Sequence, residues 1–522
     1  MKKLIACCLL ILLVAACGRG PVPDNGYPEY TPAPQYEEDD YTNQEPAHVD
    51  APGFDRFDHY DISLTIDPAT RTVTNGMSRI RFTNRTGDDL SEIVLRVPLN
   101  VFNESARHSF NEFEESVFRH GRDYGYMDIQ YVTVDNEDLN FELDGTVLLL
   151  HLDMPLAPEA TVQLVLQYSA YIPMIAHRVG ANQQAMWFGM LLPMLAVYGD
   201  DGWLTNELYP AGDPFVLEMA NFIVEITTPA DYIVAGTGIK TGEIPVEDTD
   251  TRVTTFVANN TRDFAFAISP HFQQEWISTE SGDIHLYYFT EDLPVDTILE
   301  IARLSMDYFS YRIRHYPFDH IRIIETDMYR DVMTFSNVIF IDTSALTEPN
   351  HEALTRALGH QWFFNVVGSD PVAESWLDKG LIRYLTARLI NNRPALLLTY
   401  MNNIYAGVSA REDLYLTNGL GAFENWQDYY KTHHVKGMLM FNALSNHMSD
   451  DMFWELIRQY FQTFYFRIAT GADFINLAEE IYGNSLASFF DQWFIGGAVP
   501  LLPDRQRLDT HATEHVEDEE RQ

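Results

Sequence analysis

Residues 356–363 read RALGHQWF, and residues 376–380 read WLDKG. A zinc site built on one helix needs His-Glu-x-x-His, because the i, i+4 spacing places both imidazoles on one face and the Glu acts as general base. Here only the second histidine of that pattern is present, as His360. The first histidine is replaced by Arg356 and the Glu by Ala357. The stretch therefore predicts the helical frame of a zinc site without its zinc chemistry.

Residues 359–385 extend this motif and read GHQWFFNVVGSDPVAESWLDKGLIRYL. The segment resembles the M1 aminopeptidase family, which are gluzincin zinc peptidases, at almost every position that is not catalytic. The resemblance implies a third zinc ligand, a Glu, after 18 intervening residues from His360, and Lys379 stands at that position. Of the implied ligand set the chain keeps only His360.

Two further segments resemble motifs of the same family. Residues 331–341, DVMTFSNVIFI, are similar to the Gly-x-Met-Glu-Asn strand, whose Glu grips the amino terminus of the substrate; Thr334 stands at that Glu. Residues 434–437, HVKG, are similar to Tyr-x-Lys-Gly, whose phenol stabilises the oxyanion; His434 stands at that Tyr. The resemblance thus implies that the catalytic positions Ala357, Thr334 and His434 are all degenerate.

The apolar pattern of the chain changes between its two halves. Alternating runs, such as 60–66 and 222–226, are typical of strands. Longer stretches with a period of 3.6 predict helices at residues 296–314, 352–366, 376–391 and 452–466. Residues 60–84 also resemble the opening strands of the M1 β-domain. We therefore expect an α+β fold: an antiparallel β-domain over 53–275, then a mainly helical domain over 276–503 that the resemblance identifies as thermolysin-like (gluzincin).

Length and charge restrict the class of protein. At 522 residues and 46% hydrophobic content, the chain is long and apolar enough to bury cores in two or three domains. The net charge of −42 excludes ordinary nucleic-acid binding, which needs clustered Lys and Arg against phosphate. Residues 18–52 are acidic and Pro-rich and predict a disordered tether, and residues 504–522 predict a charged tail.

The first 17 residues have the form of a lipoprotein signal peptide. Two lysines precede an apolar run at 4–14, which is too short to span a bilayer. Residues 14–17, Val-Ala-Ala-Cys, have the form of a lipobox that ends on the cysteine to be lipidated. We therefore expect cleavage before Cys17, a lipid on Cys17, and an extracytoplasmic protein anchored to the membrane.

The residues at the implied ligand positions do not suit zinc. Arg356 keeps its proton at any working pH, and Lys379 must lose one to become a ligand. No zinc or other cofactor is therefore expected, although active relatives use zinc. One improvised set stays open, namely His360 with His434 and Asp378, but the two nearby cations oppose it.

Each of these side chains also has a purely structural interpretation. His360 can persist as a buried imidazole with a hydrogen-bond partner, and His433 and His434 can be surface residues at the start of a helix. Arg356 and Lys379 can form salt bridges, which is the commonest fate of partly buried cations. Candidate partners for them are Glu374, Asp378 and Glu325.

The implied site nevertheless exchanges anions for cations. The base, the third ligand and the amine anchor read Ala357, Lys379 and Thr334, and one ligand histidine reads Arg356. An unpaired buried charge is costly. We hypothesise that Arg356 and Lys379 replace zinc in the charge balance of the fold. They are then expected close together near His360, each paired with a carboxylate or facing an anion-sized cavity.

Two functions remain open. The first is a surface lipoprotein of the M1 fold that lacks catalysis and binds a peptide or a partner protein in the cleft, where the cations would suit a carboxylate-bearing ligand. Its candidate binding residues are Arg356, Lys379, His360, Thr334 and His434. The alternative is a zinc-dependent metalloaminopeptidase acting on extracellular peptides, for which the sequence offers no nucleophile–base pair, no second ligand triad and no amine anchor. A fold does not carry a function without its site.

Overall fold

The computed structural model describes residues 56–105, 113–206, 209, 212–214, 216–407 and 414–495. These residues belong to one compact unit, which runs from Gly53 to Gln522. The signal peptide, the tether, the lipidation site at Cys17 and the charged tail lie outside the described residues and stay predictions. None of the helices in the described ranges is long and apolar enough to cross a membrane.

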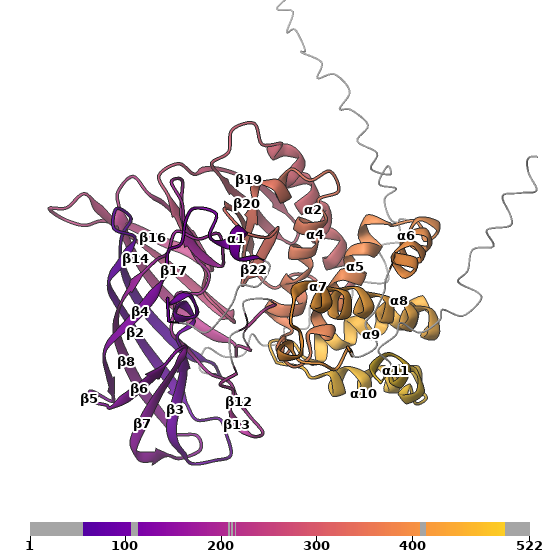
Figure 1. The fold of residues 1–522 in the computed structure, drawn as a ribbon, viewed down its shortest axis with the longest axis horizontal. Helices are drawn as coiled ribbons and strands as arrows, with labels where there is room; N and C mark the ends of the chain where they lie inside the picture. The colour runs from indigo at the N-terminus through magenta and orange to yellow at the C-terminus, as the bar shows by residue number, and fades with distance from the viewer. Residues whose placement is uncertain are drawn as a thin grey trace, which may run out of the picture. The chain divides into compact units, whose positions relative to one another are not determined.

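The N-terminal half is built on an eight-stranded sheet, coloured indigo to magenta in Figure 1. Its strands, in spatial order, are β16 (Ile239–Pro245), β17 (Thr251–Thr261), β14 (Ala220–Pro229), β1 (Asp58–Asp67), β2 (Thr72–Thr83), β8 (Thr161–Tyr171), β4 (Tyr126–Val134) and β5 (Glu137–Asp138). Side chains along β1 and β8 alternate between buried and more exposed, as period-2 strands on a core require. All neighbours pair antiparallel except β1 and β14. The expectation of a purely antiparallel domain is wrong at this pair, because β14 returns to β1 through a long connection instead of a hairpin.

Smaller sheets cover the apolar face of the large one. One contains β11 (Met194–Leu195), β3 (Leu90–Arg96), β7 (Val147–Leu156) and β6 (Phe141–Asp144); another contains β15 (Ile233–Gly236), β18 (Phe266–Ser269), β10 (Met186–Phe188) and β9 (Val179–Ala181); a two-stranded ribbon contains β12 (Tyr198–Gly199) and β13 (Gly202–Trp203). The core between them includes the fully buried Ile62, Leu148 and Tyr168.

A second, five-stranded sheet opens the C-terminal half. Its spatial order is β19 (Gln273–Thr279), β20 (Gly282–Tyr288), β21 (His320–Thr326), β23 (Val338–Asp342) and β22 (Val332–Phe335). The boundary that the sequence places at 275/276 therefore falls inside β19. Strands β20, β21 and β23 are parallel, and β22 is an antiparallel edge strand that carries Thr334.

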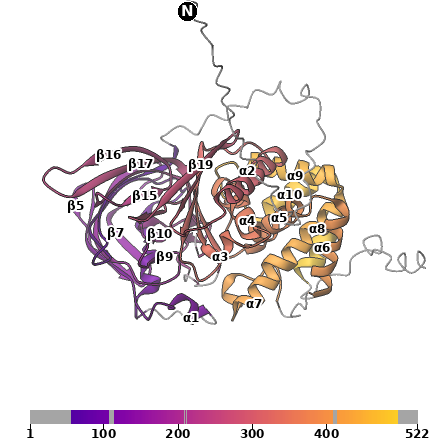
Figure 2. The ribbon, with the colours of Figure 1, turned by 90° about the horizontal axis from the view of Figure 1, so that it is seen from above.

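Helices make up most of the remaining chain. They are α1 (Glu114–Val117), α2 (Val295–Arg312), α3 (Thr343–Leu346), α4 (Glu352–Gly359), α5 (Leu381–Ile390), α6 (Pro394–Gly407), α7 (Trp426–Tyr429), α8 (Gly437–Met448), α9 (Asp450–Thr463), α10 (Gly471–Tyr482) and α11 (Ala487–Phe494). Two short 3₁₀ turns are η3 (Pro98–Phe102), which precedes α1, and η7 (Leu420–Ala422), which lies between α6 and α7. Figure 2 shows α2 beside α4 and α5 near α8, and these pairs are in contact. Local signals fix some ends: α10 begins at a capping box of Thr470 and Asp473 and ends at Gly483, whose φ is 76°.

Three wide turns with π-type geometry occur in the C-terminal half, and the first two of them fall within predicted helices. They are η5 (Gln361–Val366), η6 (Trp376–Gly380) and η8 (Tyr430–Lys436). The helix predicted at 352–366 therefore ends at Gly359, because Phe363 and Phe364 have non-helical backbone angles. The helix predicted at 376–391 becomes η6 followed by α5. Such local widenings of a helix occur frequently at functional sites.

The break at η5 leaves backbone carbonyls without helical donors, and Arg262 donates hydrogen bonds to them instead. This arginine is 2% exposed. Its guanidinium donates to the backbone oxygens of Phe364, Asn365 and Val366, and also to two carbonyls outside η5. A Cβ atom at Gly368 would lie 2.4 Å from Arg262 Cζ. A buried arginine from the β-domain therefore replaces helical hydrogen bonds and fixes the turn that follows His360.

Candidate ligand cavity

A cavity of about 370 Å³ lies between the β-domain and the helices, within the size range of small-ligand sites. Every candidate binding residue from the sequence lines it: Arg356, Lys379, His360, Thr334 and His434. Ala357, at the position of the missing base, is fully buried in the core of the helical domain. Whether the five lining residues bind a ligand stays a prediction.

The wide turns bring these residues together. His360 closes α4 and starts η5, and its backbone N–H still donates to the Arg356 carbonyl at 3.1 Å, so the i, i+4 relation holds. Lys379 lies on η6 and His434 on η8. These two turns meet at a pair of glycines, and a Cβ at Gly380 would lie 2.8 Å from the backbone carbon of Gly437. Only glycine permits this close approach. The approach places Lys379 of η6 and His434 of η8 in the wall of the same cavity.

Lys379 is held by two carboxylates. Its side chain is 5% exposed, and its Nζ contacts Asp378 Oδ2 at 2.6 Å and also Asp213. Burial alone lowers the pKa of an ammonium, but Asp213 and Asp378 outweigh it and raise the pKa of Lys379 above its ordinary value. Lys379 therefore keeps its proton and has no lone pair to offer a metal.

Asp213 joins Lys379 to a second cation. Arg178 Nη2 contacts its other oxygen at 2.6 Å and also donates to the Gly212 carbonyl at 2.7 Å. Burial alone raises the pKa of Asp213, but Lys379 and Arg178 outweigh it and hold that pKa below the usual range. Of the partners proposed from sequence, Asp378 does pair with Lys379. Glu374 instead accepts from the Gly471 amide at 2.8 Å, and Glu325 has hydroxyl and amide donors.

Arg356 has a much weaker partner. Its Nη2 lies 3.9 Å from Asp331 Oδ2, and that aspartate is 59% exposed. The Arg356 side chain is 17% exposed, and its Nε is buried without a hydrogen-bond partner among the described residues. The neighbouring Arg383, by contrast, meets Glu352 Oε1 at 3.0 Å. Arg356 is therefore left short of hydrogen-bond acceptors within the cavity.

The two cavity histidines are neutral. His360 is buried, and its ring hydrogen-bonds to the backbone of Phe363. Burial first, and then Lys379 and Arg356, hold the pKa of His360 well below its ordinary range. Burial, followed by cations led by Arg383 and Arg356, does the same for the pKa of His434.

The surface position considered for His433 and His434 is wrong, because both are buried. The reason is η8, which turns His434 inward between aromatic rings. Its ring centre lies 5.2 Å from that of Tyr430 and 5.4 Å from that of Tyr429. Both ring nitrogens of His434 are buried, and neither has a hydrogen-bond partner in the described ranges.

These side chains do not form a zinc site. The improvised set left open by the sequence needs Asp378, whose Oδ2 is engaged by the Lys379 ammonium. Across the parts of the chain that the structure describes, no three His, Cys, Asp or Glu residues gather closely enough to hold a metal ion. The donor set thus does not fit zinc, because a protonated lysine and a guanidinium occupy the places of two ligands.

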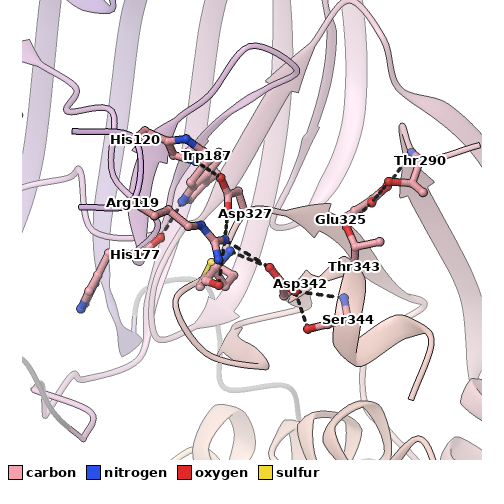
Figure 3. Close-up of polar contacts among 11 residues, drawn as sticks. Arg119, His120, His177, Trp187, Thr290, Glu325, Asp327, Asp342, Thr343 and Ser344 are labelled. Atoms are coloured by element: carbon pink, nitrogen blue, oxygen red, sulfur yellow. Dashed lines mark hydrogen bonds and ion pairs between the residues drawn. The ribbon is translucent and has the colours of Figure 1, made fainter. Parts of the chain in front are cut away.

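The segment after β21 brings a further arginine, Arg330, into the cavity wall. Figure 3 shows how the residues before Arg330 are anchored: Arg119 and His120 reach toward Asp327. Arg119 Nη2 also donates to the Met328 carbonyl at 3.1 Å. Next along the chain, the Tyr329 ring stacks on His177 at 4.7 Å between ring centres. The backbone leading to Arg330 is therefore fixed from the β-domain.

Sequence reasoning missed four of the charged residues that line this cavity, Arg178, Asp213, Arg330 and Arg383. Asp213 pairs with Lys379 across 166 positions of sequence. Single charged residues in loops have no spacing pattern to reveal such a pair. A Gly-Asp-Pro turn at 212–214 was the one available hint, since it makes an isolated carboxylate rigid.

The buried neutral state of His434 predicts a measurable pH effect. The unfolded chain protonates this imidazole below about pH 6.5, whereas the folded chain does not. The unfolded state then binds more protons, so the free energy of unfolding falls as pH drops, by up to about 1.4 kcal/mol per pH unit for one group. We expect His434→Phe, which keeps the ring packing, to reduce this slope between about pH 6 and 4.5.

Urea unfolding at several pH values measures the slope of the unfolding free energy against pH. His271→Phe, at an exposed position, is the control. An equal slope in the wild type and in His434→Phe would contradict the conclusion that His434 is neutral in the folded chain.

Comparison with known proteins supports the same architecture. Residues 332–493 match the Peptidase family M1 domain. Probable aminopeptidase 2 from Sulfurisphaera tokodaii is 20% identical over 225 residues, which are 40% of this chain and 29% of that protein. The match thus spans less than a third of that relative's length.

Solved structures with the same fold include the M1 zinc metallopeptidase from Deinococcus radiodurans. It has a TM-score of 0.63 at 17% identity, with 86% of this chain and 96% of that chain covered. A mutant of that protein bound to a Tyr-Ser-Ala substrate also has a TM-score of 0.63 at 17% identity and covers 86% of this chain and 97% of its own. At this identity the likeness shows the fold alone. It confirms the expected α+β class, a β-domain followed by a mainly helical domain.

Proposed function

The protein is M1 aminopeptidase-like in its fold and in its C-terminal domain, and on that premise we propose that it is a binding protein without peptidase activity. The proposal is that a short peptide, or the end of a protein chain, enters the cavity and is held there uncleaved. Its main support is Lys379, whose ammonium sits between Asp213 and Asp378 at the position where active relatives carry a metal-binding carboxylate.

The charge pattern supports binding over decay of an unused site. Loss of a metal leaves a cluster of carboxylates that repel one another, and Lys379 neutralises two of them. The cavity nevertheless remains open at about 370 Å³. A space of this size admits a few residues of peptide and excludes a folded domain, so a partner protein would enter only through an extended segment.

A binding protein of this kind should lack both bound zinc and peptidase activity. After equilibration with zinc and removal of the excess, the purified chain is expected to hold far less than one zinc and to release no product from aminoacyl reporter substrates. The mechanism needs a ligand set and a general base, and positions 356, 357 and 379 supply neither. Elemental analysis and a fluorogenic peptidase assay measure the two properties.

The competing function, a zinc-dependent aminopeptidase acting on extracellular peptides, makes the opposite prediction. It requires about one zinc per chain and peptidase activity that a chelator removes and zinc restores. Tight metal binding without activity would contradict both the proposed absence of a zinc site and the enzyme. These outcomes separate the two functions without knowledge of the natural ligand.

A further inference from the structure

The basic side chains that line the cavity differ in whether they have a carboxylate partner. Lys379, Arg178 and Arg383 each have a carboxylate within 3.0 Å. Arg356 has only a 3.9 Å contact to an exposed carboxylate, and its Nε is unpartnered among the described residues. Arg330 forms no ion pair with any residue in the described ranges. Its guanidinium carbon lies 3.4 Å from the centre of the Trp426 ring.

Arg330 and Arg356 lie in the wall of the same cavity. Both line the cavity, and burial lowers the pKa of Arg330, with smaller opposing effects from Tyr329 and Asp331, which raise it, and from Arg356, which lowers it. Stacking on Trp426 fixes the guanidinium plane while leaving its N–H groups available at the edge. Two guanidiniums so short of acceptors are an unusual feature in a chain of net charge −42.

His434 also lines this cavity, and its lack of hydrogen-bond partners is a second, independent indication of a ligand. It is 5% exposed and lines the same cavity, yet neither ring nitrogen has a hydrogen-bond partner in the described part of the chain. A buried polar group without a hydrogen-bond partner destabilises the fold, because it has lost its contacts with water and gained none in exchange. A neutral imidazole has one N–H to donate, which an anionic oxygen beside the two arginines would accept.

We propose that Arg330, Arg356 and His434 together bind the carboxyl terminus of the peptide that enters the cavity. Guanidinium groups and carboxylates match in geometry and form charge-assisted hydrogen bonds. The proposal rests on the proposed function and adds a direction to it: the carboxyl end of the ligand lies at Arg330 and Arg356. Lys379, which the sequence also suggested for this role, is already occupied by two carboxylates.

The test uses N-acetylated tri-alanine with a free or an amidated carboxyl end, titrated calorimetrically into the purified protein. We expect the free acid to bind at least tenfold more tightly than the amide, because a lost charge-assisted hydrogen bond at a buried site is worth about that factor. Arg330→Gln and Arg356→Gln should each remove most of this difference. His434→Phe should weaken the free acid more than the amide.

Arg312→Gln is the matched control. Arg312 also stacks on a tryptophan, with its guanidinium carbon 5.2 Å from the Trp454 ring centre, but it does not line the cavity. This variant should keep the full preference for the free acid. If Arg312→Gln reduces the preference for the free acid as much as Arg330→Gln and Arg356→Gln do, the assignment to Arg330 and Arg356 is wrong.

The remaining outcomes separate the two levels of the proposal. Equal binding of the free acid and the amide sinks the carboxylate assignment while peptide binding stands. Absence of binding by both peptides contradicts the proposed function and the inference together. Inorganic phosphate serves as a competitor: if it binds the wild type more tightly than the free-acid peptide and depends on the same two arginines, the site is for a phosphoryl group and the carboxylate assignment is wrong.

Discussion

Replacing Lys379 with Ala is expected to lower the free energy of unfolding by about 3–5 kcal/mol, because it removes the cation that both Asp378 and Asp213 contact. Asp213 keeps a second cation, Arg178, at 2.6 Å. Asp378 is the more affected of the two carboxylates, since its side chain is only 4% accessible to solvent. Burial already raises the pKa of Asp378, and the loss of Lys379 removes the charge that opposes this rise. Urea unfolding at pH 7.5 gives the change in free energy.

Lys240→Ala is the appropriate comparison. Lys240 pairs with Glu243 at 3.2 Å, but both side chains are solvent-accessible, and surface pairs contribute at most about 1 kcal/mol. A Lys379→Met, Asp378→Asn double variant should recover part of the loss, because it removes one charge of each sign together. If Lys379→Ala costs no more than Lys240→Ala, the ammonium does not hold the cavity wall, and the idea that it replaces a metal in the charge balance fails.

The helical frame around His360 could be predicted because its information is local. The spacing between positions 356 and 360 places both on one helix face whatever surrounds them, and both line the cavity. The helix that was expected to continue to 366 breaks instead, because Arg262, a residue about one hundred positions earlier, supplies donors to the carbonyls that the break exposes. No periodicity within 352–366 records that distant arginine.

The partners of the cavity cations show the same limit. Asp378 is adjacent to Lys379 in sequence and was among the candidates, whereas Asp213 is brought in from the β-domain and was not. A surface position was one of two interpretations of His434, beside a place in the binding site, because two histidines and a lysine in a short run are usually solvated. Its burial depends on the contact between Gly380 and Gly437, where two backbones meet without side chains. The sequence around either glycine does not show that the two backbones come into contact.

Restoring the missing ligands should convert the cavity into a zinc site. In an Arg356→His, Lys379→Glu variant, the imidazole introduced at position 356 would stand one helical turn from that of His360, and the new carboxylate would face them across the cavity. We expect about one zinc per chain, where the wild type holds far less, measured by elemental analysis after removal of excess metal. Without zinc the new carboxylate lies beside Asp213 and Asp378, so like charges should destabilise the metal-free variant.

Zinc should therefore stabilise this double variant strongly and the wild type hardly at all. Ligand binding to the folded state adds about 4 kcal/mol at a thousandfold excess over the dissociation constant, which a thermal shift with and without zinc detects. Adding His360→Gln removes one of three ligands and should abolish both the zinc and the shift. Lys379→Glu alone keeps the Arg356 cation and only one histidine, so it should hold no stoichiometric metal. If the double variant also binds none, positions 356, 360 and 379 do not converge on one point, and the interpretation of Lys379 as a replacement for zinc loses its geometric basis.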